Sequence, residues 1–350
     1  MEDTPQATSS VETRKPPRIS WYRSPVSRED LIALNKRSDL MGFLQTLGFM
    51  AVLIATGGGA VWAVYHVHWL LAVVLFFCHG TCASFLINGF HELIHDSVFR
   101  TRFLNRLFLW IFSFWGWYSF VHFWASHTEH HKYTLHPPDD GEVVLPIQIQ
   151  RKAYLKRAFI DPLGLWGTLK LFARWSVGRV EGDWECALFP ESNVAGRRRL
   201  FNWARFVLAG HVAIVTVCLA MGWWYVPLVT TFSRFYGAWL FALCNSAQHI
   251  GLTDNVPDFR LCCRTILLDP ITQFLYWHMN YHTEHHMYAA VPCYKLGKLH
   301  RLIRDDLPHC PRGLYETWTH IAEIQRKQED DPDYQFVAEL PTQPATQPVT

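Results

Sequence analysis

The chain has 350 residues, a formal net charge of +2, 50% hydrophobic residues and 15% aromatic residues. This composition excludes a disordered or fibrous chain and indicates a membrane-rich one, while a mean hydropathy near zero predicts a sizeable polar part outside the bilayer. The small net charge, without a basic stripe interleaved with aromatic residues, excludes nucleic acid as a partner.

Both ends of the chain have the composition of disordered segments. Residues 1–20 are rich in Pro, Ser, Thr and charge, and residues 327–350 are first acidic and then rich in Pro, Gln and Thr. The first apolar run begins only near Met41, so we expect no secretory signal peptide. We therefore predict a disordered N-terminal segment, one membrane domain over residues 21–326 and a disordered C-terminal tail.

Four apolar stretches approach the ~20 residues that a helix needs to cross a bilayer. The links within the first pair and within the last pair carry no Lys or Arg, whereas basic residues gather at the other ends of the stretches. By the positive-inside tendency, both termini and residues 89–200 face the cytosol. The predicted spans are residues 41–64, 69–88, 204–222 and 226–244.

A fifth apolar run, residues 103–124, is also long enough to cross the bilayer, and a crossing there would reverse the later topology. We predict an interfacial helix instead. Arg106 sits in its first turns, Trp and Tyr crowd its far end, and the histidine clusters that flank it are expected to share one site.

Histidines gather in short clusters. The stretch HTEHH occurs at residues 127–131 and again at 282–286, although an H-x-x-H-H triplet is expected by chance only about 0.05 times in such a chain. Residues three or four apart are neighbours on a helix, so each copy presents three rings on one face. In HMNYHTEHH, His278 would join that face if the helix included it.

Two further pairs have the i, i+4 spacing by which one helix offers two side chains to a metal. His91 and His95 follow the second span, and Asn245 and His249 lie at the end of the fourth. On the predicted topology all clusters meet on the cytosolic side. Nine imidazoles and one amide exceed a single tetrahedral zinc and suit two metal ions with open positions, but imidazole binds Fe, Cu, Zn and Ni alike, so the metal stays open.

The predicted fold is therefore an all-α polytopic membrane protein with about four transmembrane helices and a cytosolic helical cap that holds a di-metal site. Acidic residues within the histidine clusters could accept the outer ring N–H groups and fix each tautomer, or could be ordinary surface carboxylates. His278 is expected to have a structural or supporting role ahead of direct ligation. The supporting candidates are Glu92, Asp96, Glu129, His278 and Glu284.

Arg234 falls near the middle of the fourth predicted span, where an isolated cation costs at least ~2.5 kcal/mol. Two interpretations are open. Arg234 could bind a carboxylate or polar head of the substrate, or the span boundary could be misplaced so that Arg234 reaches the membrane interface.

The combined motifs HELIH, HTEHH and HTEHH, with spans before and between them, resemble the three histidine boxes of the membrane fatty acid desaturase and hydroxylase superfamily. Asn245 and His249 resemble the extra Asn-x-x-x-His pair of its acyl-CoA desaturases. The resemblance covers roughly residues 30–310. It implies a non-haem di-iron centre under a cytosolic cap that oxidises an unactivated C–H bond with O₂ and two electrons. The implied metal ligands are His91, His95, His127, His130, His131, His249, His282, His285, His286 and Asn245.

This resemblance favours an O₂-dependent desaturase of fatty acyl or related lipid-like substrates, in the endoplasmic reticulum or a bacterial inner membrane. A hydroxylase of the same superfamily is the nearest alternative, and a zinc hydrolase or a metal-transport protein is a more distant one. The first box has three residues between its histidines where acyl-CoA desaturases typically have four, so their substrate rules do not transfer. No cytochrome b5 signature is fused to the chain, so a separate donor of the cytochrome b5 or ferredoxin type, with its reductase, must supply electrons.

The nine cysteines include no C-x-x-C pair, which argues against a zinc ribbon or a disulfide framework and fits a reducing environment.

Overall fold

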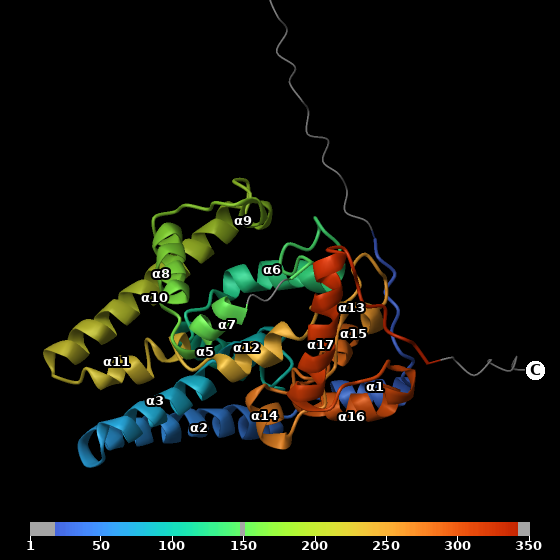
Figure 1. Cartoon of the computed structure of the whole chain (residues 1–350). Helices are drawn as coiled ribbons and strands as arrows, with labels where there is room; N and C mark the ends of the chain where they lie inside the picture. The colour runs from blue at the N-terminus through green and yellow to red at the C-terminus, as the bar shows by residue number, and fades with distance from the viewer. Residues whose placement is uncertain (1–17, 148–150, 342–350) are drawn as a thin grey trace, which may run out of the picture.

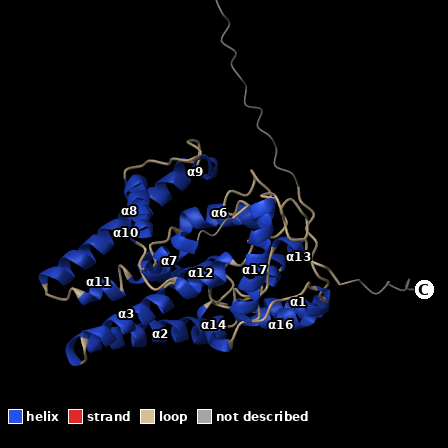
Figure 2. Cartoon of the chain, in the orientation of Figure 1, coloured by secondary structure: helices blue, strands red, loops and turns tan. Residues whose placement is uncertain are grey.

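The computed structural model describes residues 18–147 and 151–341, and the regular structure within these ranges is helical, with isolated β-bridges and no strand (Figure 2). The all-α prediction is therefore confirmed. All nine cysteines are free. Most of the predicted disordered N-terminal segment, residues 1–17, and the last part of the predicted tail, residues 342–350, lie outside the described residues.

Three helices in the described part are long and apolar enough to cross a membrane, and they match the first three predicted spans. The first is α2, the second is divided by a short turn into α3 and α4, and the third is α10. In Figure 1 the links 67–68 and 221–224 lie at the same end of the molecule. The bounds are Asp39–His66 for α2, Trp69–Ala83 for α3, Leu86–Ile94 for α4 and Val194–Ala220 for α10.

The fourth predicted span, residues 226–244, is not one continuous helix. Its residues form α11 (Tyr225–Val229), a 3-10 turn η1 (Ser233–Phe235) and the start of α12 (Trp239–Ser246). Gly237 has φ +69°, which L side chains rarely adopt, and a Cβ there would lie 2.6 Å from the carbonyl oxygen of Phe77. The sequence signalled apolar length correctly but not this close approach between the backbone and α3.

Side chains of α3 and of the turn between α5 and α6 donate hydrogen bonds to the backbone carbonyls that the interruption leaves free. His79 on α3 lies with Nε2 3.0 Å from the oxygen of Val229, and the indole of Trp117 donates to the oxygen of Thr231 over 2.9 Å. Non-helical backbone at membrane depth is tolerated where protein groups satisfy its polar atoms. The interrupted segment therefore fits beside α3 and α10 without a full helical crossing.

The apolar run at residues 103–124 is divided between α5 (Arg102–Trp115) and α6 (Phe120–Tyr133), so the single interfacial helix that we predicted is two helices. Each has 14 residues, or about 21 Å at 1.5 Å per residue, which is short of the ~30 Å of a bilayer core. The chain turns at Gly116, and Trp117 there has φ +55°.

The remaining helices form the cap and its supports. In Figure 1, α1, α13, α15, α16 and α17 gather at the end of the molecule opposite the link 67–68. Met287, Phe259, Leu296 and Leu299 belong to one buried cluster that joins α13, α15 and α16. The bounds are α1 Arg28–Asn35, α7 Arg151–Phe159, α8 Pro162–Ser176, α9 Asp183–Leu188, α13 Phe259–Cys262, α14 Pro270–Leu275, α15 His282–Met287, α16 Cys293–Ile303, η2 Arg304–Asp306 and α17 Gly313–Asp330.

The boundary of the predicted tail at residue 327 is too early. The acidic stretch forms the last turn of helix α17, which continues to Asp330. Beyond the helix, the backbone N–H of Phe336 donates to the oxygen of Gly251 over 2.9 Å. The ring of Phe336 also packs edge-on against His320, at 4.4 Å between centroids. Residues up to 341 are thus part of the described cap.

Candidate metal centre

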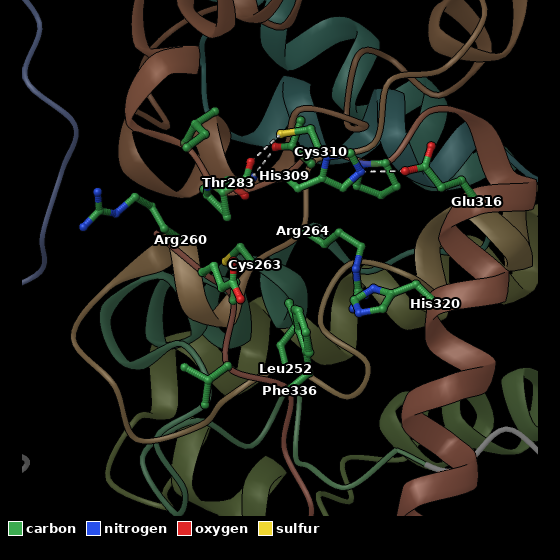
Figure 3. Close-up of a pocket in the computed structure, with 17 residues that line it drawn as sticks. Leu252, Arg260, Cys263, Arg264, Thr283, His309, Cys310, Glu316, His320 and Phe336 are labelled. Carbon is green, nitrogen blue, oxygen red and sulfur yellow. Dashed lines mark hydrogen bonds and ion pairs between the residues drawn. The ribbon is translucent and has the colours of Figure 1, made fainter. Parts of the chain in front are cut away.

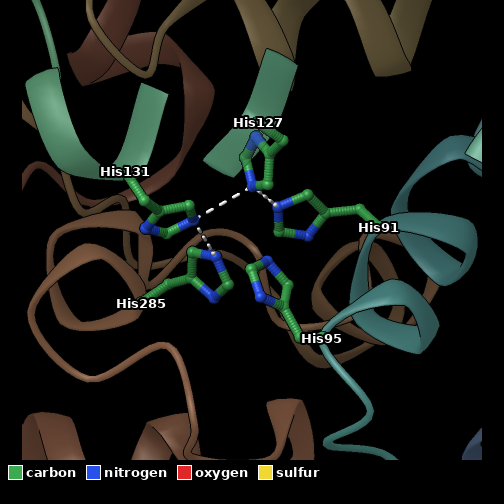
Figure 4. A group of neighbouring side chains, drawn as sticks. All are labelled: His91, His95, His127, His131 and His285. Carbon is green, nitrogen blue, oxygen red and sulfur yellow. Dashed lines mark hydrogen bonds between the residues drawn. The ribbon is translucent and has the colours of Figure 1, made fainter. Parts of the chain in front are cut away.

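The nine histidines of the predicted ligand set form two adjacent groups. Within each group, one potential ligand atom from each residue lies within 4.8 Å of all the others. Figure 4 shows the larger group, in which the five rings point toward a common centre. The groups are His91, His95, His127, His131 and His285, and His130, His249, His282 and His286.

Helix α4 and the residue after it supply the first pair. His91 lies on α4, and His95 follows as the C-cap residue, so both rings project from one side of the helix end. His91 Nε2 lies 2.7 Å from His127 Nε2 on α6. The buried His95 Nε2 has no hydrogen-bond partner in the described part of the chain, which leaves its lone pair available to a cation.

The two HTEHH copies divide their rings between the groups in opposite ways. In α6, His127 and His131 enter the five-histidine group and His130 enters the four-histidine group. In α15, His282 and His286 enter the four-histidine group and His285 enters the five-histidine group. At about 100° per residue, side chains at i and i+4 diverge by only about 40°, whereas those at i+3 and i+4 diverge by about 100° and can reach different centres from the same broad face. Each of these two helices therefore contributes histidines to both groups.

His249 completes the four-histidine group from the turn that follows α12. Its Nε2 lies 2.8 Å from His282 Nε2, and His282 Nε2 lies 3.2 Å from His286 Nε2. In the other group, His131 Nε2 lies 3.0 Å from His127 Nε2 and 3.2 Å from His285 Nε2. Two imidazole nitrogens bound side by side to one metal at ~2.1 Å, about 90° apart, are separated by about 3.0 Å. The spacing fits shared ligation.

The hydrogen-bond partners of the Nδ1 atoms, which face away from the centre of the group, determine which nitrogen of each ring carries the proton. His249 Nδ1 lies 2.7 Å from the carbonyl oxygen of Cys262, which can only accept, so Nδ1 donates and Nε2 presents a lone pair. Thr134 gives its hydroxyl proton to the oxygen of His130, so it accepts from His286 Nδ1 at 3.2 Å. The Nε2 lone pairs of His249 and His286 therefore converge on His282.

Carboxylates have the same effect in the five-histidine group. Glu92 Oε1 lies 3.0 Å from His91 Nδ1, and Glu142 Oε1 lies 2.9 Å from His127 Nδ1. With protons on these outer nitrogens, the two facing Nε2 atoms both present lone pairs only 2.7 Å apart. Such an arrangement is unfavourable alone and is stabilised by a cation between the rings, so the residues fit a bound metal ion.

Electrostatics favour neutral rings. Burial lowers the pKa of His95 and of His249 to about 3, and it lowers the pKa of His127, His131 and the three histidines of α15 well below the ordinary value of 6.5. His130 differs. Burial would lower its pKa, but the hydrogen bond to Asp140 and the charge of that carboxylate raise it above the ordinary value. Neutral imidazole is the form that binds a metal.

The supporting candidates differ in position. Glu92 is buried and also approaches His285, with 3.6 Å between Oε1 and Nδ1. Glu284 is fully buried but faces away from the rings, where it accepts hydrogen bonds from Thr265 and, at 2.5 Å, contacts His300 Nδ1. Glu129 pairs with Lys132 at 2.7 Å on the surface. Asp96 has φ +54° at the turn that follows His95.

Three predicted residues lie apart from the two groups. His278 precedes α15 at φ +59°, so it cannot share the helical face that we predicted for it, and its Nδ1 lies 3.0 Å from Gln273 Nε2. Asn245 is exposed on α12, four residues before the buried His249, and its role as a ligand stays a prediction. Arg234 is half-buried, donates to the oxygen of Gly116 over 2.5 Å, and lies 4.7 Å above the ring of Tyr118.

Sequence reasoning missed the residues that hold His127 and His130 from behind. Asp140 Oδ2 lies 2.8 Å from His130 Nδ1, and Glu142 lies behind His127 and also accepts from Ser126 at 2.7 Å. The stretch PPDDGE after the second cluster was the sequence feature that could have indicated them. A loop that follows a helix can fold back and place its carboxylates beside the histidines of that helix. Leu135, at φ +55°, makes that return possible.

The sequence model of the family described as Fatty acid desaturase matches residues 67–318. No curated protein matches the chain. The matched range contains all nine histidines of the two groups.

Proposed function

Since the chain belongs to the fatty acid desaturase family, we propose that it is an O₂-dependent oxidoreductase that introduces a double bond into a fatty acyl chain or related lipid-like substrate. The observation that carries the proposal is the convergence of nine imidazoles from four separated parts of the chain into two adjoining groups. Three apolar helices and the family together place the protein in a membrane, which is where such substrates lie.

The two groups are proposed to hold two iron ions. Bound iron would supply the activation of O₂ and the removal of hydrogen from an unactivated carbon. His91, His95, His127, His131 and His285 would hold one ion, and His130, His249, His282 and His286 the other, with Asn245 beside the second directly or through water. The absence of a carboxylate from both groups suits a centre whose ligands stay neutral.

The chain's own residues have three tasks in this scheme. Glu92, Glu142, Asp140, Thr134 and the Cys262 carbonyl orient the rings through their outer nitrogens. Seven of the nine histidines are buried, and His95 and His131 are partly buried, so the site restricts access of bulk water, which would otherwise compete for a reactive centre. An apolar wall that includes Phe90 and Phe123 packs against His91 and His127 on the side of α4 and α6, and would hold the substrate methylene.

The reaction is balanced only if electrons and protons enter from outside. Desaturation removes two hydrogens from the substrate, and these, with two further electrons and two protons, reduce one O₂ to two waters. Hydroxylation uses the same two electrons and two protons but leaves one oxygen in the product and releases one water. We propose a separate electron donor of the cytochrome b5 or ferredoxin type, with its reductase.

We propose that the metal centre and both termini face the cytosol, in the endoplasmic reticulum or a bacterial inner membrane. Basic residues before α2 and at the start of α10, such as Arg37 and Arg198, lie at the ends of the spans nearer the cap, while the links 67–68 and 221–224 carry none. This asymmetry follows the positive-inside tendency.

Mass spectrometry of lipids from cells with and without the expressed gene tests the proposal. A product lighter by two hydrogens supports desaturation, and a product heavier by one oxygen identifies a hydroxylase. Purified protein should contain about two irons per chain and consume O₂ with a reductase. Zinc without redox activity would instead indicate a hydrolase or a metal-transport protein and would contradict both oxidative functions.

A further inference from the structure

A cavity of about 280 Å³ lies in the cap, behind the helix that carries the second HTEHH copy. Thr283 of that copy forms part of its wall, together with Thr265, Cys263 and Arg264. Figure 3 shows Arg264 beside His320 of α17 at this cavity. The cavity is therefore adjacent to the four-histidine group without including any of its histidines.

Arg264 holds the turn from which His249 projects. Its Nη1 donates to the oxygen of Ala247, its Nη2 donates to the oxygen of Ile250 over 3.1 Å, and its backbone N–H donates to the oxygen of Gln248 over 2.8 Å. Residues 247–250 form turns after α12 ends, so no longer helix holds them in place. These three hydrogen bonds therefore hold the backbone both before and after His249 in the sequence.

The same short segment also holds the ring of His249. Cys262, two residues before Arg264, offers its carbonyl oxygen to His249 Nδ1 at 2.7 Å. Backbone and ring are therefore held by neighbouring residues of one segment. The ring is left little freedom to turn its Nε2 away from His282, which lies 2.8 Å away.

Burial makes the charge of Arg264 costly. The residue is 6% exposed, and among the described residues its guanidinium contacts carbonyl oxygens and no carboxylate. A buried cation needs partners of opposite polarity, and here the carbonyl oxygens of the turn after α12 provide the partial negative charge. The planar fork of arginine can reach two carbonyls at once, which the single ammonium of lysine cannot.

We propose that Arg264 is a positioning residue for the four-histidine group, and that its loss empties this group of metal while the five-histidine group keeps its ion. The inference rests on the proposed metal-dependent function. It concerns how the two groups differ: in the described part of the chain, His249 is the only one of the nine histidines that projects from a turn whose backbone carbonyls accept hydrogen bonds from a buried cation.

Metal content of the purified full-length chain in detergent, loaded with Fe(II) and washed, tests this proposal. We expect about two ions per chain for the wild type, and about one for Arg264→Ala, for His249→Ala and for the double variant. The double variant should lose no more than His249→Ala, because both changes act on one group.

The adjacent cavity permits a rescue that a general loss of folding would not show. Guanidinium chloride at a few millimolar can enter the space left in Arg264→Ala and should restore the content to about two ions per chain. The same salt should leave His249→Ala at about one ion, since the missing group is then an imidazole. His320→Ala, which changes the same cavity without removing a bond to the turn, should hold about two ions.

The results distinguish failure of the positioning role from failure of the proposed function. Two ions in Arg264→Ala, a further loss in the double variant, or loss of both ions without rescue would each overturn the positioning role. If Arg264→Ala does not fold, Arg264→Lys replaces it, and retention of both ions by that variant at wild-type affinity would also overturn the role. A wild type that binds no metal would instead contradict the proposed function.

Discussion

Asp140 Oδ2 lies 2.8 Å from Nδ1 of His130, and both side chains are buried. The same carboxylate accepts from the backbone N–H groups of Leu135 and Glu142, each over 2.9 Å, so it joins the loop after α6 to the four-histidine group. A carboxylate behind a ligand ring fixes the tautomer and makes the ring a stronger donor to the metal.

Asp140→Asn should therefore weaken metal binding while the fold remains. Asparagine has a similar shape but no charge, so we expect the affinity to fall by about 10–100-fold. Competition with a chromogenic chelator measures the affinity. Glu129→Gln is the matched control, because Glu129 lies beside His130 on α6 but pairs with Lys132 on the surface. Equal affinities for Asp140→Asn and the wild type would show that the carboxylate has no such role.

The second prediction compares the two glutamates of the HTEHH copies. Glu284 is fully buried and contacts Thr265 and His300, whereas Glu129, at the matching position, is partly exposed. Glu284→Gln should lower the free energy of unfolding by about 1–3 kcal/mol, because it leaves buried partners imperfectly paired. Glu129→Gln should change it by less than about 0.5 kcal/mol.

Thermal unfolding of the two variants in the same detergent, followed by circular dichroism, provides the comparison. A similar loss for both variants would mean that burial of Glu284 does not matter to stability.

The gathering of the nine histidines could be predicted because most of their spacing is local. Residues at i, i+3 and i+4 of one helix share a face whatever the rest of the chain does, so HTEHH was informative on its own. The division of each copy between two groups was not predictable, because it depends on how α6 and α15 face each other. Asp140 and Glu142 were missed for the same reason, since a loop brings them back to α6.

The fold was predictable where length and apolarity decide it, as in α2 and α10. It was not predictable where one close contact decides it. Gly237 approaches α3 in a conformation that L side chains rarely adopt, and this close approach lies within the apolar run that the structure divides into separate short elements. His278 illustrates the same limit, because its positive φ takes it off the helix that its spacing suggested.

The third prediction concerns the stability of metal-free protein in acid. Burial lowers the pKa of His95 and His249 to about 3 in the folded state, against an ordinary value of 6.5. Below pH 6.5 the unfolded chain therefore binds protons that the folded chain does not, so stability is full above pH 6.5 and falls as the pH decreases toward 3. The loss is about 1.4 kcal/mol per pH unit for each such histidine.

Thermal unfolding of chelator-treated protein at pH 7.5 and pH 5.5 measures this loss. A variant with both His95→Gln and His249→Gln should show a smaller difference between the two pH values, because it has fewer buried imidazoles. A melting temperature that is independent of pH over this range would contradict the assignment of neutral, buried rings.

The last prediction tests Arg234 as a residue that binds the polar end of the substrate. Among residues 18–147 and 151–341, its guanidinium donates one hydrogen bond, to the oxygen of Gly116, and lies against Tyr118, while an arginine carries five donors in all. A half-buried cation with donors to spare can bind a carboxylate or another polar head. Loss of a charged hydrogen bond of ~1.5–3 kcal/mol corresponds to about 10–100-fold in affinity, so Arg234→Ala should raise KM by about that factor.

The control must loosen the same loop without removing the charge. Trp117→Phe deletes the indole N–H that donates to the oxygen of Thr231, a contact that joins the same two segments as Arg234 does. We expect Trp117→Phe to lower the melting temperature and leave KM unchanged, because the cation stays in place. If both variants lower stability equally and neither changes KM or turnover, Arg234 serves only to hold the interrupted segment against the turn at Gly116, and the substrate must be bound elsewhere.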